Sequence, residues 1–379
     1  MSTQKETTPL TQKQVQIFPT ETCDLKCSGC PYPNQSAEKK IILRRSEIDP
    51  SNWRVITDFL YNEGNRLFCV MGGEPASYDG IDQVIANITA HPDAFVLLST
   101  SGIHLLHREK LRKSIGQALV QPKNRSFKNG IAISFDSIPV FDKSNTKNSR
   151  EFKAKQGLDF VQLMQNEFPN QITYVANVMV NPDNLSQVPQ IQTYLEQRGI
   201  YTNLCTQQGK CFGKSSAIFD STHVSQLNNI AIEMIKRKIN SKLVVNSVSY
   251  LSQLSKLIGA ENYHCWEEPD GNSVIDISPD GKLRYCNWID QNQNEGPPAE
   301  PIQNLVDKSI LWSEFWSRSK SQTQKLCSGC SWSRRDRGIT PMVEFNLDIL
   351  KTANLPAFNP EDPKLQNIWT QAQMSVLVS

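Results

Sequence analysis

The sequence predicts an α/β protein in which a parallel sheet carries its helices on the outside. Short apolar runs and amphipathic segments alternate six times over the first two hundred residues. Helical crossovers of this kind join strands that run in the same direction. The composition is that of an ordinary globular protein, with 38% hydrophobic and 21% charged residues in a chain of 379. Such a chain can bury the large core that the sheet requires.

Each predicted element follows from its local pattern. The six strands are VQIFP from Val15, LFCVM from Leu67, FVLLST from Phe95, IAISF from Ile131, TYVANVMV from Thr173 and YTNLC from Tyr201. Helical periodicity marks the segments PSNWRVITDFLYNEG, IDQVIANITA, HREKLRKSIGQAL, LDFVQLMQNEF and NLSQVPQIQTYLEQRG between them. Parallel sheets place their sites at the C-terminal strand ends, so the loop after each strand is where chemistry is expected.

The alternation stops after Gly209, and the rest of the chain is organised differently. A segment with helical spacing is followed by a region with four of the ten cysteines. This region contains a predicted hairpin, SVIDISPDGKLRYC, which turns at PDG. The expected divisions are a flexible N-terminus over 1–14, the α/β core over 15–215, a helical connector over 216–260, a small second domain over 261–340 and a tail over 341–379.

Charge and targeting signals exclude several classes of partner. Forty Lys and Arg balance 38 Asp and Glu, with no long run of one sign, so neither a nucleic acid nor an acidic membrane is expected as a partner. The first residues are polar and carry no signal peptide, and no stretch approaches a membrane-spanning length. We therefore expect a cytoplasmic protein, whose cysteines serve metal ligation or catalysis more readily than disulfides.

Three cysteines crowd into the loop after the first predicted strand. In FPTETCDLKCSGCPYP, Cys23, Cys27 and Cys30 follow the spacing CxxxCxxC. Four thiolates close an iron-sulfur cluster, whereas three leave one iron open to an exogenous ligand. A zinc knuckle or a chance grouping is the alternative, but zinc needs a fourth ligand and no His or Cys follows soon. The motif therefore predicts a substrate-binding cluster.

This motif after a first strand resembles that of the radical S-adenosylmethionine (SAM) superfamily, and the resemblance extends over about residues 15 to 335. It implies a partial (β/α)6 barrel and a [4Fe-4S] cluster that binds SAM through its open iron. It also implies a shared first step, in which reductive cleavage of SAM gives methionine and a 5′-deoxyadenosyl radical. That radical takes a hydrogen atom from a substrate inside the barrel.

The resemblance also implies a set of SAM-binding residues. They are Gly72, Gly73, Glu74 and Pro75 in MGGEP, Ser101 in STSG, Ser134 and Asp136 in SFDS, and Asn177. Glycines suit close approach of the backbone to a ligand. An ordinary turn for GGEP and satisfied polar strand ends for SFDS are the alternatives. Gly29 departs from the family, which carries a large residue there near the adenine, so Tyr32 is a substitute candidate.

The second domain resembles the SPASM and twitch auxiliary-cluster domains. Cys265 and Cys286 flank Gly281 at the family's spacing, and Cys327 and Cys330 follow as CxxC. Four cysteines suffice for one further [4Fe-4S] cluster, which is nearer to the twitch form. A hairpin followed by CxxC also describes a zinc ribbon, so zinc is the alternative.

The remaining thiols and two histidines have separate interpretations. Cys69 lies within an apolar strand and is expected to be a small core residue. Cys205 ends the sixth strand, where a thiol directed into the barrel could donate a hydrogen atom or act as acid or base. Cys211 lies in the next loop, and both could equally be inert. His104 and His107 share a helical face that is expected to be solvated.

Enzymes that pair this barrel with this domain chiefly modify ribosomally made peptides by cross-linking, epimerisation, excision or oxidation. The resemblance therefore favours a peptide substrate. Dehydrogenation or epimerisation of a sugar-derived molecule is the alternative, and a non-catalytic iron-sulfur electron carrier is an alternative of another class. Few residues precede the first strand, so a separate leader-peptide-binding protein is an expected partner. A flavodoxin or ferredoxin is expected as electron donor.

Overall fold

The computed structural model describes residues 14–25, 27, 30, 35–121, 128–139, 149–206, 219–241, 243–246, 250–251, 254, 274–284, 299–310, 314–315, 317–318 and 321. In this part of the chain one curved sheet has the strand order β6-β5-β4-β3-β2-β1-β7-β8-β9. The six predicted strands are all confirmed and are parallel neighbours. They are β1 (Gln14–Thr20), β2 (Leu67–Gly72), β3 (Phe95–Thr100), β4 (Gly130–Ser134), β5 (Thr173–Val180) and β6 (Tyr201–Thr206).

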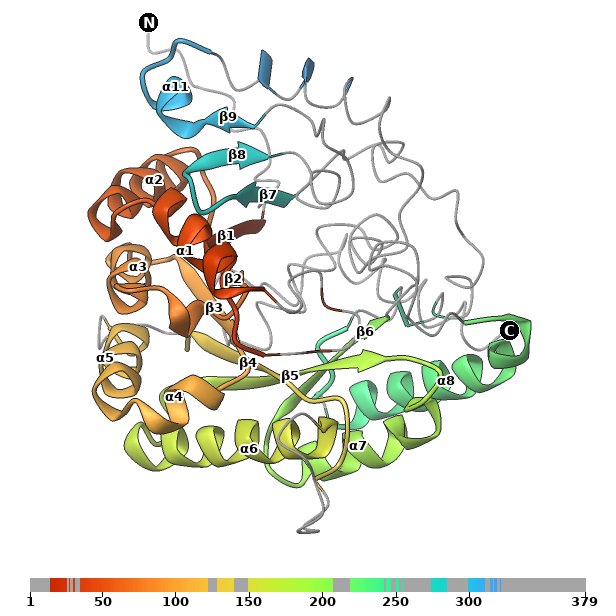
Figure 1. Cartoon of the computed structure of the whole chain (residues 1–379). Helices are drawn as coiled ribbons and strands as arrows, with labels where there is room; N and C mark the ends of the chain where they lie inside the picture. The colour runs from red at the N-terminus through yellow and green to blue at the C-terminus, as the bar shows by residue number, and fades with distance from the viewer. Residues whose placement is uncertain are drawn as a thin grey trace, which may run out of the picture.

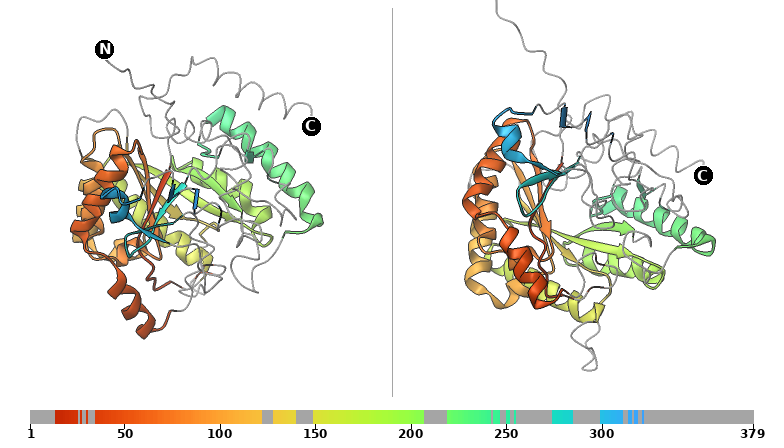
Figure 2. Two further views of the ribbon diagram at one scale, coloured as in Figure 1. Left: turned by 90° about the horizontal axis from the view of Figure 1, so that it is seen from above. Right: turned by 45° about the horizontal axis from the view of Figure 1, so that its top comes forward.

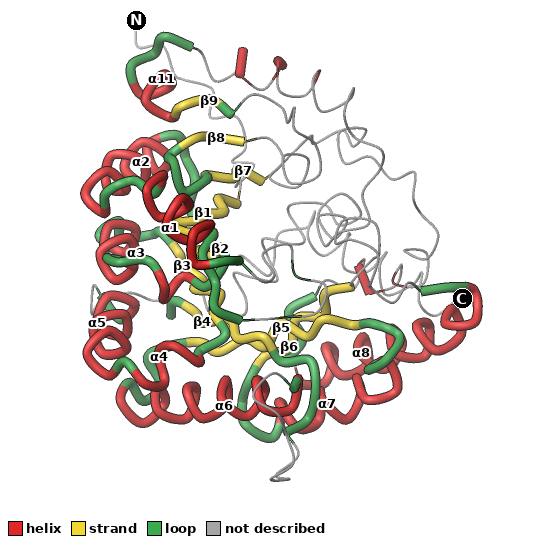
Figure 3. The backbone as a smooth tube through the Cα atoms, in the orientation of Figure 1, coloured by secondary structure: helices red, strands yellow, loops and turns green. Residues whose placement is uncertain are grey.

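Helices cover the convex side of this sheet, so the sheet forms a partial barrel (Figure 1). The main ones are α1 (Ala37–Ser46), α2 (Pro50–Asn62), α3 (Ile81–Thr89), α4 (Ile103–His107), α5 (Glu109–Leu119), α6 (Arg150–Glu167), α7 (Val188–Glu196), α8 (Val224–Ser241) and α11 (Ile302–Val306). Short 3-10 turns are η1 (Pro75–Ser77), η2 (Leu185–Gln187) and η3 (Ser221–His223). The fold predicted from strand and helix alternation is confirmed, and Figure 3 shows the strands lining the concave side.

Local signals explain where the outer helices begin and which face they bury. Asp49 caps α2 by accepting from the Ser51 backbone N–H, and Pro50 occupies the first turn, where a missing N–H costs nothing. Trp53 and Leu60 of the same helix are fully buried against the sheet. Ser149 caps α6 in the same way. Helices α2 and α6 therefore each start at a side-chain cap, and their buried apolar residues fix them on the sheet.

Alternation along each strand separates an apolar outer face from a partly polar inner face. In β5, Val178 and Val180 are fully buried in the core under the helices, whereas Asn177 and Met179 alternate with them and are only partly buried. Successive side chains of a strand point to opposite faces. Asn177 and Met179 therefore face the concave side, where a ligand of the barrel would lie.

The predicted hairpin is confirmed, and it extends the same sheet. Strands β7 (Val274–Ile277) and β8 (Lys282–Arg284) are antiparallel, with a turn in which Gly281 has a φ of +71°. Strand β7 pairs with β1 in parallel, and β9 (Glu300–Pro301) continues beyond β8. The strand that precedes the cysteine loop is thus paired on both sides.

Two features of the helices differ from the sequence prediction. The helix predicted over 107–119 is found as α5, which begins at Glu109, and a short helix that was not predicted, α4, precedes it. Helix α1 is not predicted by apolar periodicity, because none of its residues is buried. In the described residues, no helix has both the length and the apolar character needed to cross a membrane.

Candidate active site

The cysteine loop leaves the C-terminal end of β1 and enters the concave side of the sheet. Cys23 is buried, with 8% of its surface exposed, whereas Cys27 and Cys30 are half-buried. A backbone hydrogen bond of 3.3 Å from Cys30 to Cys27 closes a turn, and the Leu25 N–H donates to the Cys23 sulfur at 3.4 Å. The three thiols thus come from one short, internally bonded loop.

The GGEP motif supports the base of this loop through its backbone. The Gly73 N–H donates to the Thr20 carbonyl at 3.0 Å, and the Glu74 N–H donates to the Thr22 carbonyl at 2.9 Å. A Cβ on Gly72, whose φ is +148°, would lie 2.2 Å from the Thr20 oxygen, and one on Gly73 would lie 2.3 Å from the Thr22 oxygen. Both positions require glycine because two backbones meet there.

The Glu74 carboxylate is buried and fully hydrogen-bonded by the protein. One oxygen accepts from the Thr100 hydroxyl at 2.5 Å and the Ala76 N–H at 3.2 Å. The other accepts from the Ser101 N–H at 2.9 Å and the Ser101 hydroxyl at 2.6 Å. A carboxylate has about four acceptor positions. A ligand ammonium would therefore have to replace one of these donors, and the rotatable Ser101 hydroxyl is the simplest to replace.

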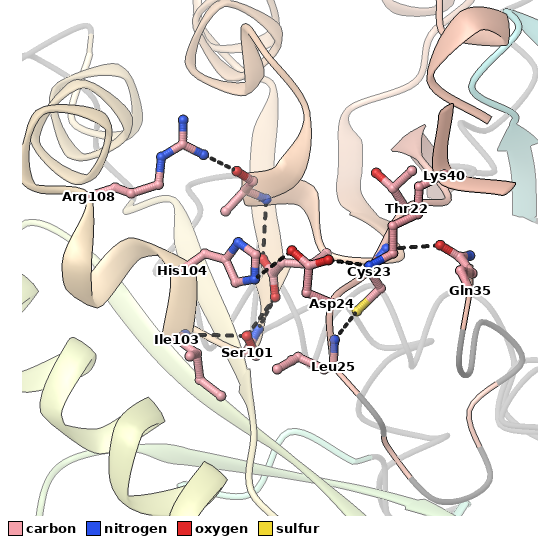
Figure 4. Close-up of polar contacts among 12 residues, drawn as sticks. Thr22, Cys23, Asp24, Leu25, Gln35, Lys40, Ser101, Ile103, His104 and Arg108 are labelled. Atoms are coloured by element: carbon pink, nitrogen blue, oxygen red, sulfur yellow. Dashed lines mark hydrogen bonds and ion pairs between the residues drawn. The ribbon is translucent and has the colours of Figure 1, made fainter. Parts of the chain in front are cut away.

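The outer side of the loop is held by α1, its leading residues and α4, as Figure 4 shows. The Gln35 side chain accepts from the Cys23 N–H at 3.3 Å and donates to the Glu21 carbonyl at 2.8 Å. Asp24 lies between Lys40, which donates to it, and His104, whose Nε2 is 3.8 Å away. The Lys40 hydrogen bond holds the pKa of Asp24 below its ordinary value.

Three thiols in one loop are a donor set that an iron-sulfur cluster with one open iron can use. Burial raises the pKa of the Cys23 thiol to about 12, and the charges of Glu74, Cys30 and Cys27 add to the increase, so the three thiols share one electrostatic environment. Iron binding would replace the proton of each thiol. Among the described residues no three His, Cys, Asp or Glu side chains form a single-ion site. A [4Fe-4S] cluster does not require a single-ion site, because each cysteine binds a different iron atom.

One cationic group contacts the cysteine loop, and one acidic group lies just after β4. The Lys153 ammonium of α6 is 3.5 Å from the Cys27 sulfur. Asp136 accepts from the Met179 N–H at 2.8 Å. Burial raises the pKa of Asp136 to about 6, although the Met179 hydrogen bond and the charges of Arg150 and Lys153 lower it. Ser134, at the end of β4, is exposed.

Amide side chains line the concave face of β5 and β6. The Asn177 amide donates to the Ser99 hydroxyl at 3.5 Å, and the Asn203 amide donates to the Asn177 oxygen at 2.9 Å. The Asn203 amide also lies 3.5 Å from the Cys205 sulfur, and the Asn246 amide donates to the Asn203 oxygen at 3.1 Å. Cys205 is half-buried on the same strand face as Asn203. Its thiol therefore faces the barrel interior.

The predicted site residues fall into three groups. The first lies around the cysteine loop and comprises Cys23, Cys27, Cys30, Gly72, Gly73, Glu74, Pro75 and Ser101. The second lies at the ends of β4 to β6 and comprises Ser134, Asp136, Asn177 and Cys205. The third lies outside the described residues and comprises Cys265, Cys286, Cys327, Cys330, Cys211, Gly29 and Tyr32. Cys69 is buried, as expected of a core residue.

Several residues at the cysteine loop were not predicted. Asp24 lies within the motif, between two cysteines, and Gln35, Lys40 and Lys153 contact the loop from outside it. The solvated surface expected for His104 and His107 is found at His107, which is exposed, whereas the His104 side chain is 19% exposed and faces Asp24. The position of His104 as the second residue of α4, shortly after Ser101, is the signal that would have found it.

Comparison with known proteins supports the fold. No protein-family model and no curated protein matches the sequence. Among solved structures, anSMEcpe with bound AdoMet has a TM-score of 0.56 at 15% identity, over 96% of this chain and 98% of that chain. Streptococcus suis SuiB bound to S-adenosylmethionine has a TM-score of 0.55 at 14% identity, over 80% and 67%. SuiB bound to precursor peptide SuiA gives 0.53 at 14%, over 81% and 67%. The chain therefore has the partial α/β barrel fold of radical SAM enzymes.

Proposed function

We propose that this protein is a radical SAM enzyme that modifies a ribosomally synthesised peptide. The observation that carries the proposal is the cysteine loop, whose three thiols lie on the concave side of the sheet and whose base is supported by the GGEP backbone. The peptide substrate is supported by the similarity in fold to SuiB bound to precursor peptide SuiA and to anSMEcpe bound to the Cp18Cys peptide. The modification is one of cross-linking, epimerisation, excision or oxidation.

Cys23, Cys27 and Cys30 would hold a [4Fe-4S] cluster with one iron open to SAM. When bound, this cluster supplies one electron to SAM, and cleavage of a C–S bond of the sulfonium then gives methionine and a 5′-deoxyadenosyl radical. The residues proposed to hold SAM are Gly72, Gly73, Glu74, Pro75, Ser101, Ser134, Asp136 and Asn177. Lys153, which donates to the Cys27 sulfur, would offset the negative charge of a thiolate that binds iron there.

The concave face of β5 and β6 is the proposed substrate surface. Asn177 and Asn203 present amides that can both donate and accept, which suits the alternating groups of a peptide backbone. The barrel excludes water from the radical. Cys205 is the proposed catalytic thiol, which would give its hydrogen atom to the substrate radical. The thiyl radical left on Cys205 would then take up one electron, supplied by the flavodoxin or ferredoxin donor, and one proton from water.

Two further components complete the proposal. Cys265, Cys286, Cys327 and Cys330 would bind an auxiliary [4Fe-4S] cluster that exchanges electrons with the substrate. A flavodoxin or ferredoxin would supply the reducing electron, and a separate protein would bind the leader segment of the peptide.

The test replaces Cys23, Cys27 and Cys30 together with Ala and compares this variant with Cys69→Ala, which removes a thiol outside the site. Anaerobically reconstituted native protein and Cys69→Ala should bind roughly eight iron atoms per chain, and the triple variant roughly four. With dithionite as reductant, the triple variant should form no 5′-deoxyadenosine from SAM.

Undiminished 5′-deoxyadenosine formation by the triple variant would refute the assignment of the three thiols. Native protein that saturates at half the expected iron, with one zinc per chain, would instead show that the second domain binds zinc. Incubation with peptides from the neighbouring genes then tests the substrate class by mass spectrometry.

A further inference from the structure

Helix α1 differs from the other helices around the sheet because it buries nothing. None of its ten residues is buried, and Ile41 and Ile42 are 52% and 66% exposed. Figure 2 shows α1 projecting from the body of the protein, at the lower edge of the left view. A helix this short is not stable on its own in water. Two adjacent isoleucines on an exposed helix are therefore an unusual surface.

The charge of α1 is strongly positive. Its sequence AEKKIILRRS has four basic residues and one acidic residue, whereas the whole chain has a net charge of only +2. At 100° per residue, Ile41, Ile42 and Arg45 share one outward face, and Lys39 flanks it. Lys39 and Arg45 are both exposed. We call these four residues, Lys39, Ile41, Ile42 and Arg45, the α1 patch.

The opposite face of α1 is attached to the cysteine loop. Lys40 donates to Asp24, the residue that follows Cys23. Gln35, just before the helix, bonds to the backbone of both Cys23 and Glu21. A partner that binds the α1 patch is therefore separated from the three cysteines by one helix and its two tethers.

We infer that the α1 patch is the docking surface for a small acidic one-electron-transfer protein of the flavodoxin or ferredoxin class. This inference rests on the proposed function, because each cleavage of SAM requires one electron at the cluster. An apolar centre with a charged rim is the usual anatomy of a transient protein interface. Positive charge on α1 attracts an acidic donor and orients it during diffusion. The attachment to the cysteine loop explains why the docking surface lies on this helix.

The first measurement is binding, which does not depend on catalysis. A purified bacterial flavodoxin and a purified bacterial ferredoxin are titrated into anaerobically reconstituted protein by calorimetry. At least one should bind saturably, with an affinity that falls as salt is added. The double variant Lys39→Glu/Arg45→Gln, which places no acid at the helix C-terminus, should bind about tenfold more weakly at low salt. Ile41→Ser/Ile42→Ser should also weaken binding, with little change in its salt dependence.

A matched control comes from α8, which carries an exposed isoleucine one helical turn before an exposed lysine. Ile232 is 44% exposed, and Lys236 follows at i+4. The variant Ile232→Ser/Lys236→Glu makes a comparable change on a different helix of the barrel (Figure 1). Its affinity for the donor should equal that of the native protein.

The second measurement separates this inference from the proposed function. With dithionite, the α1 variants should form 5′-deoxyadenosine at the native rate, and with the reduced donor protein they should form it more slowly. If native protein formed no 5′-deoxyadenosine with dithionite, the proposed function would be refuted. The binding measurement alone would then decide the inference.

Two outcomes would overturn the inference. The first is that neither donor binds, and the second is that the α1 variants bind as well as native protein. In the first case the α1 patch would serve another occupant. That occupant would be revealed by association with vesicles of equal parts phosphatidylcholine and phosphatidylglycerol, or by a dimer in sedimentation velocity that Ile41→Ser/Ile42→Ser abolishes.

Discussion

The two ends of the candidate site are built in different ways. Around the cysteine loop, between β1 and β3, backbone groups and the buried Glu74 carboxylate, whose acceptor positions are all filled, hold the base of the loop. The side chains of Gln35 and Lys40 hold its outer side. Between β5 and β6, the contacts are made by half-buried side chains, Asn177, Asn203 and Cys205, at distances from 2.9 to 3.5 Å.

This difference matches what each end would bind. A cofactor is the same in every turnover, so a site fixed by backbone packing can hold it without adjustment. A substrate surface made of side chains can change by substitution without disturbing the strands that carry it. The comparison predicts that substitutions at the cysteine end impair folding and metal binding together. Substitutions at the β5–β6 end should alter the fate of the substrate alone.

The largest loss of stability is expected from Gly73→Ala. Its new Cβ would lie 2.3 Å from the Thr22 oxygen and 2.6 Å from the Glu21 oxygen, and neither backbone can move without displacing the cysteine loop. We expect a loss of about 3 kcal/mol of unfolding free energy in urea, with reduced iron content. Gly157→Ala, where the nearest atom is 3.4 Å away in a helix, should be stabilising by up to about 1 kcal/mol. Equal stability of the two variants would contradict the proposed role of the glycine.

A change in stability that is intermediate in size and depends on pH is expected from Asp136→Asn. Burial raises the pKa of Asp136 from 3.8 to about 6 in the folded protein. Ionisation of Asp136 therefore opposes folding, a penalty that is absent below pH 3.8, grows up to about pH 6 and is complete above it. Asn keeps an oxygen for the Met179 N–H. The variant should gain stability relative to native protein as the pH rises from 4 to 6, measured by urea unfolding.

In the control, ionisation of the carboxyl group changes the stability of the folded protein in the opposite direction. A hydrogen bond from the Ser51 hydroxyl lowers the pKa of the exposed Asp49, so its ionised form favours folding above its unfolded pKa. Asp49→Asn should therefore lose stability relative to native protein as the pH rises towards 3.8, and the difference should stay constant from about pH 4 to 6. A flat difference for Asp136→Asn over the same range would show that Asp136 is solvated in the folded protein.

The smallest effect on stability, within about 1 kcal/mol, is expected from Cys205→Ala. Its thiol is half-buried and contacts a side chain of its own strand. The variant should still cleave SAM and take hydrogen from the substrate, but it should not return a solvent-derived hydrogen to the substrate radical. Product yield and deuterium incorporation from heavy water measure this. Cys69→Ala, at a buried thiol 2.6 Å from Gln14 Nε2, should cost more stability and leave the product unchanged. Native product from Cys205→Ala would make Cys205 an inert thiol.

Much of this architecture could be predicted from the sequence, because the strands are short apolar runs between amphipathic helices. The prediction found β3 and β5 at their observed bounds. Helix α1 could not be found in the same way, because apolar periodicity reports burial and α1 buries nothing. The direction of Cys205 was open in the sequence. It is decided by pairing with β5, which sets the face that the strand presents.

The candidate site was predictable in its residues but not in its contacts. The motif MGGEP indicated where a ligand would lie, but not that Thr100 and Ser101 already occupy the Glu74 oxygens. Lys153 is distant in sequence from Cys27 and belongs to no motif, so only the fold brings the two together.

The pairing of β1 with β7 has a consequence for how the protein is made. During synthesis, β1 emerges first and can join β2 early, but its other neighbour is separated from it by most of the chain. Closing so long a loop is slow, because its entropic cost precedes the contacts that reward it. Until β7 arrives, β1 is an unprotected edge that could recruit a strand from another chain. The strand that leads into the cysteines is therefore among the last to be paired on both sides.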